Sequence, residues 1–143
     1  MLRDGVLTSE YFTVLGDGRI EIIHVSPKFT YAGTGSVVNV YDRLGTEETS
    51  DDILVESFYI VIFGDVSGDS VSNSLDASLI EEEALGKTSW SSWMSDKYCS
   101  YKLMAADVNN DTMVKSIDAS LVEHFALGVG EIDQIKGIAR TLI

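Results

Sequence analysis

The sequence predicts an α+β protein in which a small antiparallel β module precedes an all-α part. Runs rich in β-branched and aromatic residues fill the first 63 residues, whereas the remainder contains one loop-and-helix unit twice. Only Gly64 separates the last β run from the first loop, which leaves no room for a flexible linker. We therefore expect two parts that pack against each other, residues 1–63 and residues 64–143.

Four segments of the first part have the composition of β-strands. Val, Ile, Tyr and Phe are prominent in them, and Gly, Pro or Asp residues lie between them as turn signals. The predicted strands are residues 11–15, 20–25, 36–41 and 55–63.

The second part contains an internal repeat. Ser-Leu-Asp-Ala-Ser-Leu at residues 74–79 returns 42 residues later as Ser-Ile-Asp-Ala-Ser-Leu at residues 116–121. The polar residues 65–69 match residues 107–111 at the same offset. Each unit is a polar loop followed by an apolar-periodic run that ends in Gly, which predicts a loop leading into a helix.

Two further helices are predicted around the repeat. Residues 87–106, between the units, are rich in Ser and aromatic residues and predict a loop plus a short helix. Residues 131–143 carry apolar residues at helical spacing, which predicts a final amphipathic helix with Ile132, Ile135, either Ile138 or Ala139, and Leu142 on one face. The residues expected to form or cover the core of the second part are Leu79, Ile80, Leu121, Val122, Trp90 and Trp93.

Oxygen-bearing side chains recur in both loops with the rhythm of a calcium-binding loop of about 12 residues. Alternate side chains turn inward as such a loop wraps a hard cation, and position 7 contributes a backbone carbonyl. Without an ion, the three aspartates of each loop would repel one another at close range. The predicted ligands of the first ion are Asp65, Ser67, Asp69, Val71, Asn73 and Asp76, and those of the second are Asp107, Asn109, Asp111, Met113 and Asp118.

Turns rich in Asp and Asn also occur as helix N-caps and surface loops without any metal. Two copies at one offset, each joined to the same helix pattern, favour two Ca²⁺ ions over that explanation. Zinc is disfavoured because His24 and His124 lie in no ligand cluster and Cys99 is the only cysteine. Magnesium is disfavoured because it rarely uses all-protein sites.

Three departures from the calcium-loop pattern affect the expected affinity. Position 6, usually Gly, is Ser70 in the first loop and Thr112 in the second, which predicts backbone strain of about 1 kcal/mol in each. Position 12 is Asp in both loops, where EF-hands usually have the longer Glu. Position 9 of the second loop is Lys115, a cation that cannot be a ligand, so we predict that the second site is the weaker one.

The acidic composition excludes several partners. The formal net charge is −13, from 23 acidic and 10 basic residues, so nucleic acid and anionic membrane surfaces would repel the chain. A hydrophobic content of 45% indicates a folded protein rather than a disordered acidic tail.

No run approaches the ~20 apolar residues of a membrane span, and residues 1–5 lack the apolar run of a signal peptide. We expect a soluble segment of a longer protein.

The sequence gives no sign of a catalytic centre. The clustered carboxylates are assigned to the ions, and neither a Ser/His/Asp arrangement nor a phosphate-binding Gly loop occurs. Cys99 has only the distant His24 and His124 as potential bases. We predict a protein that is not an enzyme.

Over residues 63–130 the chain resembles the dockerins of bacterial cellulosome-type and cell-surface assemblies. The resemblance rests on Gly-Asp-Val-Ser-Gly-Asp at residues 64–69, on Ala-Ala-Asp-Val-Asn-Asn-Asp at residues 105–111, and on the paired Ser-x-Asp sequences. It implies two F-hand motifs, each a calcium loop with an exiting helix but without a full entering helix. The preceding residues look like the small β module found before such dockerins.

The resemblance implies calcium-dependent binding to a cohesin by a chain that is monomeric before docking. Binding would tether an attached enzyme, such as one that degrades polysaccharides, or a surface protein to a scaffold outside the cell. The implied contacts in the first copy are Ser74, Leu75, Ser78, Glu81, Glu82 and Leu85, and those in the second are Ser116, Ile117, Ser120, Glu123, His124, Phe125 and Leu127. We expect the second, more apolar set to dominate.

An alternative is that the calcium loops are purely architectural. They would then stabilise the terminal domain of a surface protein whose β module binds carbohydrate or another surface protein. A calcium sensor of the calmodulin type is disfavoured because Met is sparse and complete helix-loop-helix pairs are not expected.

Overall fold

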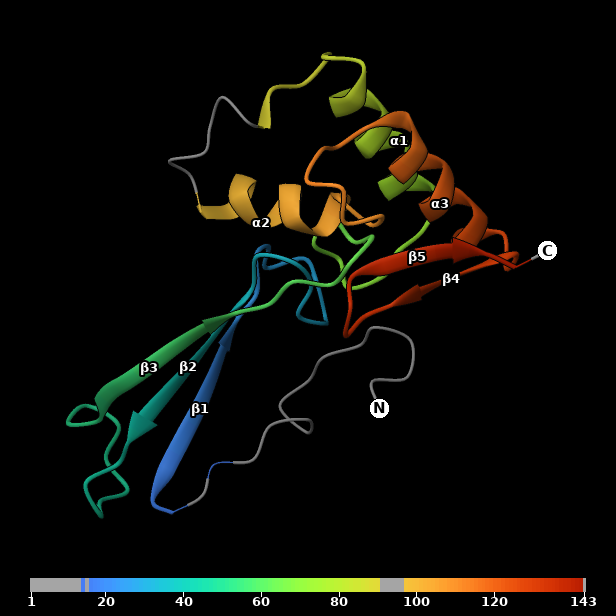
Figure 1. The fold of residues 1–143 in the computed structure, drawn as a ribbon. Coiled ribbons are helices and arrows are strands. Elements are labelled where there is room, and N and C mark those ends of the chain that lie inside the picture. The colour runs from blue at the N-terminus through green and yellow to red at the C-terminus, as the bar shows by residue number, and fades with distance from the viewer. Residues whose placement is uncertain (1–13, 15, 91–96, 143) are drawn as a thin grey trace.

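The computed structural model describes residues 14, 16–90 and 97–142, and Figure 1 shows their arrangement. The predicted strand at residues 11–15 lies, except for Val14, outside the described residues, and so does Trp93.

The first part of the chain forms an antiparallel sheet with the order β1-β2-β3. Its strands are β1 (Gly18–Ile23), β2 (Val37–Asp42) and β3 (Ile53–Tyr59). Ile22, Val38 and Phe58 lie opposite one another across the three strands. The sheet extends away from the helices as an arm (Figure 1). Three of the predicted strands are therefore confirmed, with shifted bounds.

The third strand ends at Tyr59, whereas the sequence predicted a strand up to residue 63. The Ile62 N–H donates to Thr34 Oγ1 (3.0 Å), and Thr34 Oγ1 donates to the Ile62 carbonyl (3.2 Å). The Thr34 side chain thus takes the hydrogen-bonding place of a neighbouring strand at Ile62, and the ladder between β2 and β3 ends before this residue. Ile60 and Ile62 are still buried, in a small core with Ala32 and Val38. The apolar composition correctly indicated burial but not the strand end.

The helices of the two repeated units pack side by side (Figure 1). They are α1 (Ser74–Ala84) and α3 (Ser116–Ala126). Ile80 and Val122 occupy equivalent positions in them, and both are fully buried. The residues that pack with them include Val66, Leu79, Trp90, Val108 and Leu121, so the described core residues agree with the sequence prediction.

The short helix predicted between the units is α2 (Lys97–Ala106). It ends one residue before Asp107 and therefore leads directly into the second loop. The expectation that neither loop has a full entering helix is wrong for the second loop. The first loop agrees with it, because the residues between β3 and that loop form no helix.

The predicted C-terminal helix is wrong, and its place is taken by a hairpin of β4 (Gly130–Asp133) and β5 (Ile138–Thr141). Asp133 Oδ1 accepts from the N–H groups of Ile135 and Lys136, both at 3.0 Å, which fixes a turn. Gly137 completes it at a φ of 64°. Ile135 is 95% exposed, so its helical spacing did not reflect a buried face. The second part is consequently not all-α.

The hairpin closes the second part at two points. Gln134, in its turn, exchanges two hydrogen bonds with the Phe63 backbone, each 2.8 Å long. The Ala139 N–H donates to the Val108 carbonyl (2.6 Å), and Ala139 itself is buried in the main core. The C-terminal hairpin is thereby hydrogen-bonded both to Phe63, two residues before the first loop, and to Val108 in the second loop.

The two parts contact each other directly, as expected from the missing linker. Tyr59 at the end of β3 stacks on Tyr101 of α2, with ring centroids 4.8 Å apart. The Thr34 N–H donates to the carboxylate of Asp65 (3.0 Å), which lies in the first loop. The β module therefore contacts the helical part at two places, α2 and the first loop.

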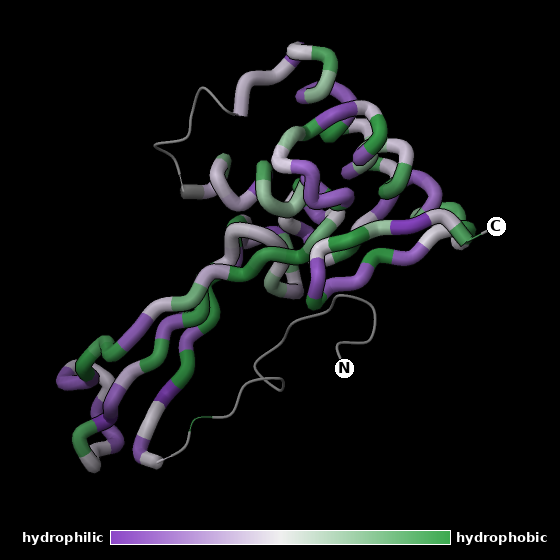
Figure 2. Tube along the Cα trace, viewed as in Figure 1, coloured by the Kyte–Doolittle hydropathy of each residue, from purple (hydrophilic) through white to green (hydrophobic). Residues whose placement is uncertain are grey.

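None of the described helices combines the length and the apolar character that crossing a bilayer requires. Figure 2 shows polar and apolar residues interspersed along the strands and helices.

Candidate metal centre

The first loop is built from residues 65–76, between the end of the β module and the start of α1. Gly64 precedes the loop with a φ of 90°, and two positive φ angles, 80° at Gly68 and 77° at Ser70, wind the loop tightly. The loop ends in a capping box, in which Asn73 Oδ1 accepts from the Leu75 N–H (2.8 Å) and Asp76 Oδ2 accepts from the Asn73 N–H (3.0 Å). The same aspartate thus starts the helix and faces the loop interior.

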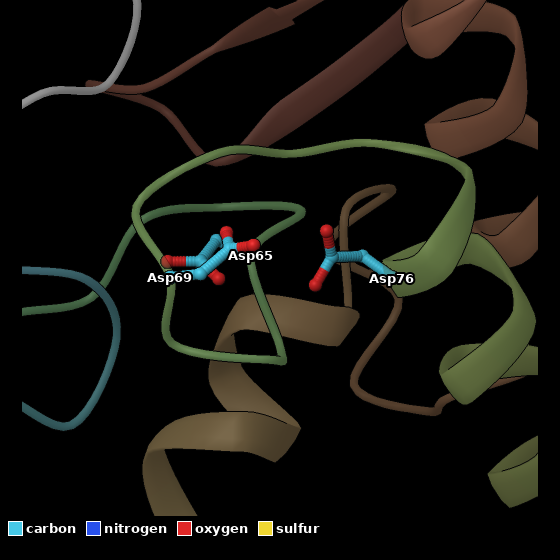
Figure 3. A group of neighbouring side chains, drawn as sticks. All are labelled: Asp65, Asp69 and Asp76. Atoms are coloured by element: carbon cyan, nitrogen blue, oxygen red, sulfur yellow. The ribbon is translucent and has the colours of Figure 1, made fainter. Parts of the chain in front are cut away.

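The carboxylates of Asp65, Asp69 and Asp76 gather inside this loop (Figure 3). One oxygen from each lies within 4.8 Å of the others, and Asp65 and Asp76 are fully buried. Figure 3 shows Asp65 and Asp69 next to each other, with Asp76 facing them from the start of α1. The structure therefore brings together three of the predicted ligands of the first ion.

Backbone N–H groups hold the two buried carboxylates in place. Asp65 accepts from Gly68 (2.7 Å), Ser70 (3.0 Å) and Thr34 (3.0 Å). Asp76 accepts with Oδ1 from the N–H groups of Val66 (3.0 Å) and Ser67 (2.8 Å).

Burial is the main electrostatic influence on this cluster. It raises the pKa of the Asp65 carboxyl to about 6, and the Asp76 carboxylate adds to the effect while the N–H donors oppose it. Burial also raises the pKa of Asp76, against the N–H groups of Ser67 and Asn73. Carboxylates held together at this cost are suited to a divalent cation, and an all-oxygen set of this kind fits the hard ion Ca²⁺.

The other predicted ligands of the first ion lie around this cluster. The Ser67 hydroxyl donates to Asp65 Oδ1 (3.3 Å), and Asn73 Nδ2 donates to the Val71 carbonyl (3.3 Å). The Val71 side chain is 45% exposed, as expected for a residue that would contribute only its carbonyl. Asn73 Oδ1 accepts from the Leu75 N–H as the N-cap of α1, so the oxygen that would bind the ion also caps the helix.

The second loop repeats part of the hydrogen-bond pattern of the first but not its carboxylate cluster. Asp107 accepts from the N–H groups of Asp111 (3.0 Å) and Thr112 (2.8 Å). Asp118 accepts from Asn109 (3.2 Å) and Lys115 (2.9 Å) and is fully buried, which raises its pKa. Among the described residues, a three-carboxylate cluster is found at the first loop only.

Lys115 distinguishes the second loop chemically. Its Nζ lies 2.9 Å from Asp111 Oδ2, and this hydrogen bond lowers the pKa of Asp111. The ammonium group therefore pairs with a predicted ligand. The remaining predicted ligands are Asn109, which accepts from the Asp111 N–H (2.9 Å), and Met113, whose side chain is 56% exposed.

The backbone at position 6 has the conformation that the sequence analysis expected to be strained. Ser70 has a φ of 77° and Thr112 a φ of 71°. The value for Thr112 is unusual, because β-branched residues rarely adopt positive φ. Position 4 is also left-handed, with 80° at Gly68 and 58° at Asn110, residue types that tolerate it.

The residues implied as partner contacts lie mostly on the surface. Leu75, Leu85, Ile117 and Leu127 are each at least half exposed, and Ser74, Ser78, Glu82, Ser116, Ser120 and Phe125 are also exposed. Ser116 Oγ donates to Glu81 Oε1 (3.1 Å), which connects the two helices. Glu123 is partly buried.

His124 differs from the expectation for a free contact residue. Its Nδ1 is 2.8 Å from Thr141 Oγ1 in β5, and it is partly buried. In the first copy, Glu83, which is equivalent to the neighbouring Phe125, accepts from the Thr88 hydroxyl (2.6 Å) and the Trp90 N–H (3.0 Å). Both positions thus hold local structure together.

Sequence reasoning missed Thr34 as a neighbour of the first loop. The Gly-Thr-Gly sequence at residues 33–35 was the available signal, because paired glycines often mark a close backbone approach.

Comparison with known proteins supports the interpretation of the second part. Residues 63–127 match the family model described as the dockerin type I domain. Searches of curated proteins and of solved structures found no significant match.

If Lys115 weakens the second loop, replacing it with the residue found at position 9 of the first loop should strengthen calcium binding. We expect Lys115→Asn to raise the affinity of the weaker calcium-binding step about tenfold, because a cation is removed from the site and an oxygen is gained. Isothermal titration calorimetry measures both steps. Lys28→Asn, an equal charge change on an exposed residue of the β module, is the control. An unchanged weaker step would contradict the role assigned to Lys115.

The raised pKa of Asp65 predicts opposite pH dependences for calcium binding and for the ion-free fold. Below pH about 6, protons compete with calcium for Asp65, so affinity should fall by up to about tenfold per pH unit between pH 6 and 5. The ion-free protein should gain stability over the same interval, because its folded state takes up a proton that the unfolded chain does not. Calorimetric titrations and thermal unfolding at pH 7 and 5 test both. Equal affinity at the two pH values would be inconsistent with this environment for Asp65.

Proposed function

From the dockerin type I domain that this chain contains at residues 63–127, we propose a calcium-dependent docking function in which the chain binds a cohesin and tethers its parent protein to a scaffold or cell-surface assembly. Dockerins in general bind calcium and dock onto cohesins, and they are interaction modules rather than catalytic ones. The observation that carries the proposal is the gathering of three carboxylates at the start of α1, within the matched residues.

The calcium would be held by the two loops. In the first, Asp65, Asp69 and Asp76 supply carboxylate oxygens, and Ser67, Val71 and Asn73 the remaining oxygens. In the second, the equivalent residues are Asp107, Asn109, Asp111, Met113 and Asp118. When bound, Ca²⁺ neutralises clustered negative charge that the fold otherwise holds in a buried position.

Calcium binding connects the loops to the proposed docking face, which consists of the exposed residues of α1 and α3. Asp76 and Asp118 are each the third residue of a helix, so fixing either carboxylate fixes the beginning of α1 or α3. Because an ion that binds only the folded state stabilises it, each site filled at 100 times its dissociation constant adds ~2.7 kcal/mol. Both helices of the docking face would thus depend on the ions for their position.

The exposed apolar residues of α1 and α3 support a protein partner. Leu75 and Ile117 are equivalent in the two copies, as are Leu85 and Leu127, and each is at least 50% exposed. Around these pairs, α1 carries three consecutive glutamates at residues 81–83, whereas α3 carries Glu, His and Phe. Apolar anchors contribute most to stable interfaces, so α3 is the preferred side for the cohesin.

The acidic composition and the proposed site favour a location outside the cell, where calcium is abundant. Calcium sites of extracellular modules commonly have dissociation constants of about 10⁻⁴ to 10⁻³ M, so weak loops remain filled there. The charge of −13 also opposes binding to nucleic acid and supports a monomeric chain before docking.

A binding assay with a panel of cohesins tests this function. We expect at least one immobilised cohesin to retain the protein in 2 mM CaCl₂, a concentration of roughly the extracellular order, and to release it when the calcium is chelated. Circular dichroism in the same buffers should show helix content falling on chelation. A protein that binds calcium and folds but is retained by no cohesin would instead support a purely architectural role for the loops.

The preference for α3 is tested with matched substitutions at Ile117 and Leu75. Ile117→Asp should lower the affinity for a cohesin by at least about tenfold, whereas Leu75→Asp should change it less than about threefold. These positions are cleaner than residues 124–125 and 82–83, since His124 and Glu83 hold local structure. Surface plasmon resonance measures the affinities. Equal losses would mean that the two helices contribute alike.

A further inference from the structure

The loop at residues 33–35 of the β module reaches into the first calcium loop. The Thr34 N–H, itself fully buried, donates to Asp65 Oδ2 (3.0 Å), although the two residues are 31 positions apart. The Thr34 side chain is fixed in turn by its two hydrogen bonds with Ile62. A residue outside the loop is therefore held rigidly against the first carboxylate of the proposed site.

The glycines on either side of Thr34 allow this approach. A Cβ added to Gly33 would collide with the Gly68 carbonyl and the Ser70 N–H, which are both part of the first loop. A Cβ on Gly35 would collide with the Tyr98 ring, and the Tyr98 hydroxyl donates to the Ser67 carbonyl (3.2 Å). Residues 33–35 are thus inserted between the first loop and α2.

The second loop provides an internal comparison. Ser70 and Thr112 are equivalent, and each donates its N–H to the first aspartate of its own loop. Within the described part of the chain, the other donor to Asp107 is Asp111 of the same loop, whereas Asp65 also receives the bond from Thr34. Asp65 is fully buried and Asp107 only partly so. The contact with Thr34 is thus one structural difference between the two loops.

We propose that residues 33–35 are a positioning segment for calcium: the Thr34 N–H fixes the Asp65 carboxylate, so that the β module sets the calcium affinity of the first loop. The inference rests on the proposed binding of calcium at that loop. The coupling is reciprocal, because an ion bound to Asp65 also holds the β module against the docking domain. The second loop is independent of this contact.

The test uses the full chain labelled with ¹⁵N and titrated with calcium. The amides of Ser70 and Thr112 report the first and second loops separately. We expect Gly33→Ala to weaken the transition at Ser70 by about tenfold, as for a lost hydrogen bond to a charged group, and to leave Thr112 within about twofold. Thr34→Ser keeps both the backbone N–H and a hydroxyl group, so this variant alone should bind calcium like the unmodified chain. Added to Gly33→Ala, it should not restore the lost calcium affinity.

Gly16→Ala is the matched control. Gly16 also lies in the β module and has a φ of 93°, but a Cβ there would meet no atom within 4 Å. The Gly16→Ala substitution introduces backbone strain without touching the first loop, so the calcium transitions at Ser70 and Thr112 should both stay unchanged. An unaltered Ser70 transition in Gly33→Ala, or equal weakening at Ser70 and Thr112, would overturn the positioning role.

A second measurement needs no substitution and covers the case in which Gly33→Ala does not fold. Hydrogen exchange of the Thr34 amide in the unmodified chain should slow by about tenfold on addition of calcium, because the carboxylate that accepts it becomes fixed. The Arg43 amide, which donates to the Asp17 carbonyl (3.1 Å) at the far end of the sheet, should not change.

Equal exchange of Thr34 with and without calcium would overturn the inference even if Ser70 shows that calcium binds. A complete lack of response at Ser70 would instead overturn calcium binding at the first loop, and the inference with it.

Discussion

The mutual repulsion of three carboxylates in one turn is the constraint on which the rest of the second part depends. Asp65, Asp69 and Asp76 lie within 4.8 Å of one another, and two of them are fully buried. Buried charge of one sign is costly, so the carboxylates need compensation, which backbone N–H groups that point inward supply in part and which a bound cation at the proposed site would complete. The positive φ angles at Gly68 and Ser70 wind the loop in which these N–H groups converge on Asp65. The strain at Ser70 thus accompanies the geometry of the site.

The two copies of the unit share a core but surround their carboxylates differently. The helices share their buried positions, Ile80 and Val122, and the loops share Val66 and Val108 in the same core. The differences lie in what touches the carboxylates. A neighbouring module donates to Asp65, whereas an ammonium group pairs with Asp111. A symmetric core can therefore carry loops with different chemical surroundings, because core packing and loop chemistry depend on different residues.

The sequence predicted those features that local patterns determine. The repeat identified the loops and both helices, since position-by-position spacing reflects how a chain wraps an ion and presents a helical face. It did not predict the C-terminal hairpin, where the turn formed by Asp133 and Gly137 outweighed the helical spacing of Ile135 and its neighbours. The early end of β3 was also missed, because it depends on the side chain of Thr34.

Contacts between distant segments could not be obtained from one sequence. Nothing in the spacing of residues 33–35 identifies Asp65 as the acceptor, and the pairing of Gln134 with Phe63 joins residues 71 positions apart. The residues proposed for docking could be selected only through the family resemblance, since amphipathic periodicity does not separate a partner surface from ordinary solvent-exposed residues.

The attachment of the hairpin turn to Phe63 has a mechanical consequence. A pull applied to the β module enters the helical part of the chain at Phe63, two residues before Asp65. There the two hydrogen bonds with Gln134 transfer part of the load to the hairpin, and through Ala139 to the shared core. The force is thus divided between two routes before it reaches the first loop, so this loop does not carry the full force on the chain.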